Sequence, residues 1–314
     1  MNTLACSSLL SISELGDELM QAQWSEHFLQ GPACTLAWYE AGAGPTVIFL
    51  SGGPGDSHHY MRSVAQPLTA SFHCVSYDQR GTGKSQLEPL DQETLRISHF
   101  FEDIEAMRTH LGLERIRLVG HSWGATLALL YSASHPEQVE NVTLVGLGPL
   151  NGEMGAVASA NADKPLNAEE RVKRQQIAAR RRAAIDAGDF ETQRELHIQL
   201  ATTFGARGSL YSPEARHIFK SFFRRFYDSN PFVNQIVSSQ LFGFIEEIRL
   251  WERLRAFKAP MLIIYGYQDF EPITQAYLLK EHVPHARLFF LNQCGHNPWL
   301  EQPAQFYAAL EAFL

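Results

Sequence analysis

Short, continuous runs of apolar residues recur along the chain, each bounded by polar or glycine-rich segments. Runs of this kind are typical of parallel strands that helices cover on both faces. The predicted strands lie at 34–40, 46–50, 73–77, 115–119 and 142–145 in the first part of the chain, and at 261–265 and 287–291 near its end.

Between these runs the apolar residues take the spacing of a helix. Phe100, Ile104, Met107 and Leu111 recur at intervals of about one helical turn and therefore share one face of a predicted helix. Another helix with an apolar side is predicted over 303–314. Strands that alternate with helices predict a doubly wound, mostly parallel sheet with right-handed crossovers.

The strand pattern stops between about residues 150 and 255. This segment begins polar and rich in helix-forming residues, and its second half becomes aromatic (IFKSFFRRFYDSNPF). We interpret it as a helical cap inserted between two strands of the sheet. The expected organisation is a first part of the core over 1–149, a cap over 150–256 and a second part of the core over 257–314.

The charge of the chain argues against some classes of partner. A formal net charge of −8 disfavours nucleic acid and anionic membranes. The basic run at 171–182 has acidic residues on both sides and no aromatic residue within it. We therefore interpret this run as the solvated face of a helix rather than a nucleic-acid site. The sequence leaves the oligomeric state open.

Four cysteines, Cys6, Cys34, Cys74 and Cys294, are scattered along the chain without a CxxC pair. Their spacing indicates neither a zinc site nor a thioredoxin-type motif, and so few cysteines are typical of a reducing compartment. The apolar patch near the N-terminus lacks the positively charged start of a signal peptide. No apolar run approaches the ~18 residues of a membrane span, so we expect a cytoplasmic protein.

A candidate nucleophile lies at the turn after the strand at 115–119. Gly120, Ser122 and Gly124 form a G-x-S-x-G motif, with an apolar strand before it and an Ala/Leu-rich helix after it. In this context the turn holds the serine in a strained conformation above the sheet, and the glycines permit close backbone approach. The next N–H groups open a helix, where negative charge is favoured.

A serine hydroxyl needs a base to remove its proton. Asp269 follows the strand at 261–265, and His296 follows the strand at 287–291. Both positions lie at the carboxyl ends of predicted strands, where open parallel sheets bind ligands. We expect His296 to move the proton and Asp269 to orient it, with Glu271 as an alternative acid two residues further on.

A glycine-rich turn, 51–55 (SGGPG), directly follows the strand at 46–50. Backbone N–H groups in such a turn can point at a developing oxyanion. We assign the oxyanion hole to the N–H groups of Gly53 and Trp123. The nearby polar cluster Asp78-Gln79-Arg80 is interpreted as a brace for this loop, with contact to substrate as the alternative.

Four motifs together resemble the proline iminopeptidase family: GGPG, YDQRGTGKS, GHSWGATLALLYSASHPEQV around the serine and GHNPWLEQP around the histidine. The resemblance implies an α/β-hydrolase fold with a mostly parallel eight-stranded sheet, a helical cap and a Ser-His-Asp triad. It further implies an aminopeptidase that releases an N-terminal residue. It covers about residues 30–148 and 257–314, and nothing in the cap aligns.

Two features depart from the family pattern. Ser51 stands where the family usually has histidine before GGPG, so the local hydrogen bonding should differ. Members of the family also hold the substrate's free amine with carboxylates from the cap, and a buried ammonium needs such partners. Glu246 and Glu247 are the candidates here, with a solvated helix face as the alternative.

The predicted reaction is acyl transfer from a small-molecule or short-peptide substrate to water, and it needs no metal or organic cofactor. A carboxylesterase or lactonase acting on small hydrophobic substrates is the alternative enzyme. A ligand-binding receptor on a hydrolase scaffold is the alternative from another class. We expect neither nucleic acid nor membrane as a partner.

Overall fold

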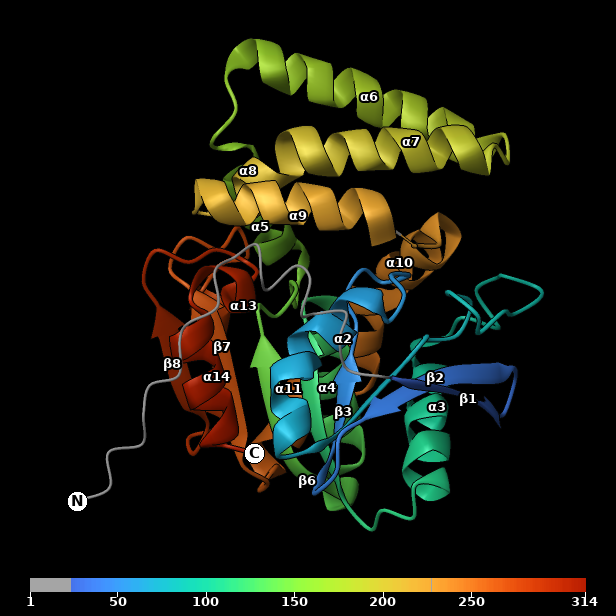
Figure 1. Ribbon diagram of the computed structural model, residues 1–314, viewed down its shortest axis with the longest axis vertical. Helices are drawn as coiled ribbons and strands as arrows, with labels where there is room; N and C mark the ends of the chain where they lie inside the picture. Colours follow the sequence, from blue (N-terminus) through green and yellow to red (C-terminus); the bar gives the residue numbers. More distant parts are fainter. Residues whose placement is uncertain (1–23, 227) are drawn as a thin grey trace.

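The computed structural model describes residues 24–226 and 228–314, and Cys6 and the N-terminal apolar patch lie outside these ranges. Within them, one eight-stranded sheet has the order β1-β2-β4-β3-β5-β6-β7-β8 (Figure 1). Pairing is antiparallel between β1 and β2 and between β2 and β4, and parallel elsewhere. The strands are β1 (Ser25–Gln30), β2 (Thr35–Ala41), β3 (Thr46–Leu50), β4 (His73–Tyr77), β5 (Ile116–His121), β6 (Val139–Val145), β7 (Met261–Gly266) and β8 (Arg287–Leu291).

Both faces of the sheet are covered, which explains the continuous apolar runs. Successive residues of β3 point to opposite faces, so Val47 and Phe49 join one apolar cluster while Ile48 and Leu50 join the other. The first face packs mainly on α2 (His59–Ala65), the 3₁₀ helix η1 (Gln66–Ala70), α13 (Pro298–Glu301) and α14 (Pro303–Glu311). The second face packs mainly on α3 (Ile97–His110), α4 (Trp123–Ser134), α10 (Pro231–Glu247), α11 (Leu250–Ala256) and α12 (Thr274–His282).

The segment between β6 and β7 is helical. In Figure 1, α6, α7 and α9 lie over the end of the sheet to which the parallel strands point. A capping box starts α6: the Asn167 side chain accepts from the Glu170 N–H, and the Glu170 carboxylate accepts from the Asn167 N–H. The helices before α10 are α5 (Gly152–Asp163), α6 (Ala168–Asp186), α7 (Phe190–Leu200), a π-helix (Ala201–Gly205), α8 (Ala206–Ser209) and α9 (Pro213–Phe226).

The later helices of this segment belong to the sheet's own core. Val233, Val237 and Leu241 of α10 and Leu250 of α11 lie in the same apolar cluster as the strands. The part of this segment that lies over the carboxyl ends of the parallel strands is therefore α5 to α9. In the described part of the chain, no helix is long and apolar enough to cross a membrane.

Candidate active site

Ser122 occupies a sharp turn between β5 and α4. Its φ of 55° and ψ of −121° are unusual for a residue with a side chain, so the turn stores strain at this position. The flanking glycines are required by contact. A Cβ on Gly120 would lie 2.2 Å from the Gly124 carbonyl oxygen, and a Cβ on Gly124 would lie 2.1 Å from the Leu50 carbonyl oxygen. The sequence motif thus forms the predicted strand–turn–helix.

The structure brings Asp269 and His296 together, although 26 residues separate them. The Nδ1 of His296 lies 2.9 Å from Oδ1 and 3.0 Å from Oδ2 of Asp269. A carboxylate only accepts, so Nδ1 carries the proton and Nε2 is left as the acceptor that a general base needs. Both side chains are buried, His296 at 7% exposure and Asp269 at 8%.

The electrostatics of the pair favour a protonated imidazole more than burial opposes it. Burial alone would lower the pKa of His296, but the charge of Asp269, its hydrogen bond and the charge of Glu271 together raise this pKa above its ordinary value. This arrangement stabilises the imidazolium that forms when histidine accepts a proton.

Glu271, the alternative acid, does not contact His296 through a hydrogen bond. Its backbone N–H donates to Asp269 Oδ1 over 2.9 Å, and its own side chain is 5% exposed. Burial raises the pKa of Glu271 to about 8; the charge of His296 opposes this rise and that of Asp269 adds to it. Glu271 is therefore largely a neutral acid at pH 7, whereas Asp269 holds the imidazole.

Gly146, at the end of β6, makes room for this pair. Its φ is +53°, and a Cβ there would lie 2.9 Å from His296 Nδ1 and 3.1 Å from Asp269 Oδ2. This glycine was not among the site residues predicted from the sequence. Its position directly after a predicted strand, beside two other strand ends, was the available signal.

The loop after β3 presents Gly53 with a φ of +114°, a conformation that favours glycine. The N–H of the preceding Gly52 is already used, because it donates to the Tyr60 hydroxyl. Gly53 is the exposed residue of the loop at 51–55. The N–H of Trp123 lies in the first turn of α4, where backbone donors lack a partner within the helix.

Gln79 connects the two segments that carry the proposed oxyanion donors, the loop after β3 and the start of α4. Its Nε2 donates to the Ser51 carbonyl oxygen over 2.8 Å, and its Oε1 accepts from the Trp123 indole over 2.9 Å. Ser51, which replaces the family's histidine, accepts from Gln79 and donates to the Asp56 carbonyl oxygen over 3.0 Å. Of the cluster at 78–80, Gln79 therefore braces the loop as expected, whereas Arg80 bonds to Asp103 of α3 instead.

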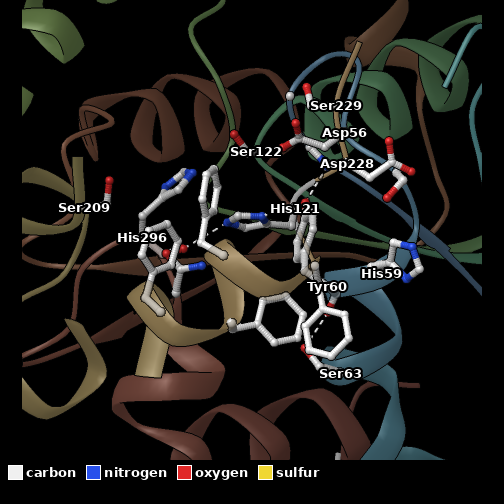
Figure 2. A pocket seen from close by; sticks show the side chains of 18 of the residues that line it. Asp56, His59, Tyr60, Ser63, His121, Ser122, Ser209, Asp228, Ser229 and His296 are labelled. Atoms are coloured by element: carbon white, nitrogen blue, oxygen red, sulfur yellow. Dashed lines mark hydrogen bonds between the residues drawn. The ribbon is translucent and has the colours of Figure 1, made fainter. Parts of the chain in front are cut away.

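Ser122, His296 and Gly53 line one cavity of about 380 Å³. In Figure 2, Ser122 stands between His296 on one side and Asp56 with Asp228 on the other. Arg181 also lines this cavity, so one residue of the basic run at 171–182 reaches inward while most of the run is exposed. The cap contributes an apolar wall from one face of α9, which consists of Ile218, Phe219, Phe222, Phe223 and Phe226.

The structure does not bring Glu246 or Glu247 to this cavity, so their proposed role as amine-binding residues is corrected. Both are exposed at the C-terminal end of α10 and neither lines the cavity. The other end of α10 approaches the cavity through Asn234. At 1.5 Å per residue, the two glutamates lie roughly 20 Å further along the helix. The carboxylates that line the cavity are Asp56 and Asp228.

Asp56 lies on a loop that is joined to the start of α10. Ser57 N–H donates to the Asp228 carbonyl oxygen, and Asn230 N–H donates to that of Gly55, each over 2.9 Å. The Asn234 amide donates to the Pro54 carbonyl oxygen over 2.9 Å. Burial raises the pKa of Asp56 to about 6; a hydrogen bond with Ser229 opposes this rise, the charge of Asp228 adds to it, and the charge of Arg181 opposes it.

Among the described residues, no group of three or more His, Cys, Asp and Glu side chains is placed to hold a metal ion. The polar groups around Ser122 are instead hydrogen-bond donors and acceptors, with the His296 imidazole held by Asp269. Such an arrangement can move a proton and stabilise an oxyanion.

The family described as the alpha/beta hydrolase fold matches residues 45–303, and the chain belongs to this family. The AB hydrolase superfamily protein YclE of Bacillus subtilis (strain 168) is 26% identical over 89% of this chain and 95% of its own. A proline iminopeptidase of Saccharolobus solfataricus is 24% identical over 87% of this chain and 86% of its own. The structure of an alpha/beta fold family hydrolase from Bacillus anthracis str. Sterne matches with a TM-score of 0.71 and 19% identity, over 93% of this chain and 100% of that chain. The resemblance to proline iminopeptidase-like α/β-hydrolases is thereby confirmed.

Proposed function

We propose that the protein is a serine hydrolase that works through an acyl-enzyme. Ser122 Oγ attacks the substrate carbonyl carbon while His296 Nε2 takes the hydroxyl proton, and Asp269 stabilises the imidazolium. The N–H groups of Gly53 and Trp123 donate to the oxyanion. The imidazolium then protonates the leaving group, and water hydrolyses the acyl-enzyme by the same proton route.

We further propose that the substrate carries a free ammonium group beside the scissile carbonyl, as the substrate of an aminopeptidase does. The position of Asp56 carries this proposal. Its Cγ lies 3.3 Å from the point where a Cβ on Gly53 would stand, so its carboxyl group lies beside the proposed oxyanion donor. With a pKa of about 6, this group is mostly ionised at pH 7.5.

A lone carboxylate at this place would oppose catalysis. At roughly 5 Å and an effective dielectric of about 20, its repulsion of an oxyanion is about 3 kcal/mol, or about 10²-fold in rate. A substrate ammonium between the two negative groups would reverse this effect. Asp228, an exposed residue that also lines the cavity, would add a second negative charge toward the same ammonium. A proline iminopeptidase-type aminopeptidase satisfies this requirement.

A carboxylesterase or lactonase of hydrophobic substrates is the second candidate. The aromatic wall of α9 supports it, because such a wall binds apolar groups without regard to an ammonium. The two candidates differ in how they depend on Asp56: the aminopeptidase needs the carboxylate, whereas an esterase of neutral substrates would be faster without it.

The test compares three substrates: unblocked proline arylamide, the same arylamide with an acylated amine, and a short-chain aryl ester. Of the two arylamides, we expect only the unblocked one to be cleaved. Asp56→Asn should lower kcat/KM for the unblocked arylamide by about 10²-fold and raise it for the ester. Asp186→Asn, which removes an exposed carboxylate on α6, is the matched control.

The contrary result is equal activity on free and blocked amines with no response to Asp56→Asn. It would exclude the aminopeptidase and favour the esterase. A cytoplasmic location is part of the same proposal. It is supported by Cys34, Cys74 and Cys294, which are buried free thiols of the kind that a reducing compartment preserves.

A further inference from the structure

Tyr60 and His121, which both line the cavity, belong to one chain of hydrogen bonds. The Gly52 N–H donates to the Tyr60 hydroxyl oxygen, and that hydroxyl lies 3.0 Å from His121 Nδ1. His121 Nε2 lies 2.9 Å from the backbone carbonyl oxygen of His296. Figure 2 shows Tyr60 and His121 side by side in the cavity wall, close to Ser122.

The chemistry of these groups gives every bond in the chain a direction. A carbonyl oxygen only accepts, so His121 Nε2 carries the proton and donates it to the backbone carbonyl oxygen of His296. Burial lowers the pKa of His121 well below its ordinary value, and the charge of His296 adds to this, so the ring is neutral and its Nδ1 accepts. Tyr60 therefore donates to His121 while its oxygen accepts from Gly52.

This chain joins the three loops that the reaction uses. Gly52 precedes the proposed oxyanion donor, His121 directly precedes the proposed nucleophile, and His296 is the proposed base. We propose that Tyr60 and His121 are positioning residues. They hold the loop at 51–55 and His296 in the correct positions relative to Ser122. The proposal rests on the proposed acyl-transfer chemistry, but on neither choice of substrate.

Close packing around Tyr60 and His121 leaves these two side chains few other positions. Trp299 meets the His121 ring edge-on, with ring centroids 4.7 Å apart. A Cβ on Gly52 would lie 2.8 Å from the Tyr60 hydroxyl and 3.1 Å from Ser122 Cβ, so the hydroxyl fills the space beside the nucleophile. Without the Tyr60 oxygen, the Gly52 N–H would lose its acceptor and the loop would shift to find another.

Tyr60→Phe is the first test, because it removes only the hydroxyl. We expect kcat to fall by about 10²-fold with KM nearly unchanged, since displaced donors cost transition-state stabilisation rather than substrate binding. Tyr307→Phe is the matched control: its hydroxyl donates to the Val64 carbonyl oxygen over 3.1 Å, and Tyr307 does not line the cavity. The control should keep wild-type kcat.

His121→Phe is the second test, since it keeps an aromatic ring against Trp299 and removes both hydrogen bonds. The two substitutions interrupt one chain, so we expect the double variant to lose little more kcat than either single variant. Thermal unfolding of each variant separates a local effect from loss of fold.

Two outcomes would overturn the proposal. One is a Tyr60→Phe protein with kcat within about twofold of the control. The other is a double variant whose loss is the product of the two single losses, because additive effects mean independent roles. Neither outcome touches the proposed acyl-transfer chemistry, which is contradicted if Ser122→Ala retains activity.

Discussion

Replacing Gly146 by alanine should disable the site without unfolding the protein. The added Cβ would lie 2.9 Å from His296 Nδ1 and 3.1 Å from Asp269 Oδ2, whereas ordinary contacts begin near 3.4 Å. The pair must therefore move by about 0.5 Å, or β6 must move instead. Because a 1 Å misplacement of reacting groups can cost about 10²-fold, we expect kcat to fall by roughly 10- to 100-fold.

The same substitution also strains the backbone, and this effect has to be measured separately. A residue with a Cβ in the left-handed region costs roughly 1–2 kcal/mol. Gly112→Ala is the matched control, since Gly112 has a φ of +66° and nothing within 4 Å of the added Cβ. Both variants should lose similar unfolding free energy, and only Gly146→Ala should lose kcat.

The assay is kcat on an aryl ester or arylamide, with urea unfolding of each variant measured in parallel. Equal kcat for the Gly146→Ala and Gly112→Ala proteins would refute the reasoning. It would mean that the His296–Asp269 geometry does not limit the reaction.

Further predictions concern the acid, the pH profile and a buried ion pair. Asp269→Asn should lower kcat on the order of 10⁴-fold while Glu271→Gln has little effect, and the reverse order would make Glu271 the acid. Because only the neutral imidazole can act as base, kcat/KM should rise with pH through a His296 pKa above 6.5, and this limb should move to lower pH in Asp269→Asn. Asp103→Asn should destabilise the fold by about 3 kcal/mol in urea unfolding, because it leaves the fully buried Arg80 without its carboxylate partner. An unchanged unfolding free energy would contradict that account of the pair.

The features of the fold that depend on local pattern were predictable from the sequence. Buried parallel strands are continuous apolar runs, so seven of the strands were placed to within a few residues. The edge strand β1 was not, because its residues are mostly exposed and its sequence, SEHFLQ, has no such run. The candidates Ser122, Asp269 and His296 could be chosen because each lies within a few residues of the end of a strand, and the fold brings those strand ends together.

The residues that shape the cavity were not predictable in the same way. Asp56 and Asp228 are far apart in sequence and meet only because the start of α10 pairs with the loop after β3. Glu246 and Glu247 matched the expected chemistry, but the length of α10 carries them away from the cavity. The aromatic wall had a signal in its helical spacing, at 218, 222 and 226, but its direction depends on how α9 packs over the sheet.

Labelling with a fluorophosphonate tests the central claim most directly, since the probe bonds to a serine that a general base activates. Mass spectrometry of the digested protein should find the phosphonate on Ser122 alone, and the Ser122→Ala protein should not be labelled. A receptor on a hydrolase scaffold would give slow labelling and no turnover of any of the three substrates. Labelling of another serine, or labelling that persists in Ser122→Ala, would contradict the account.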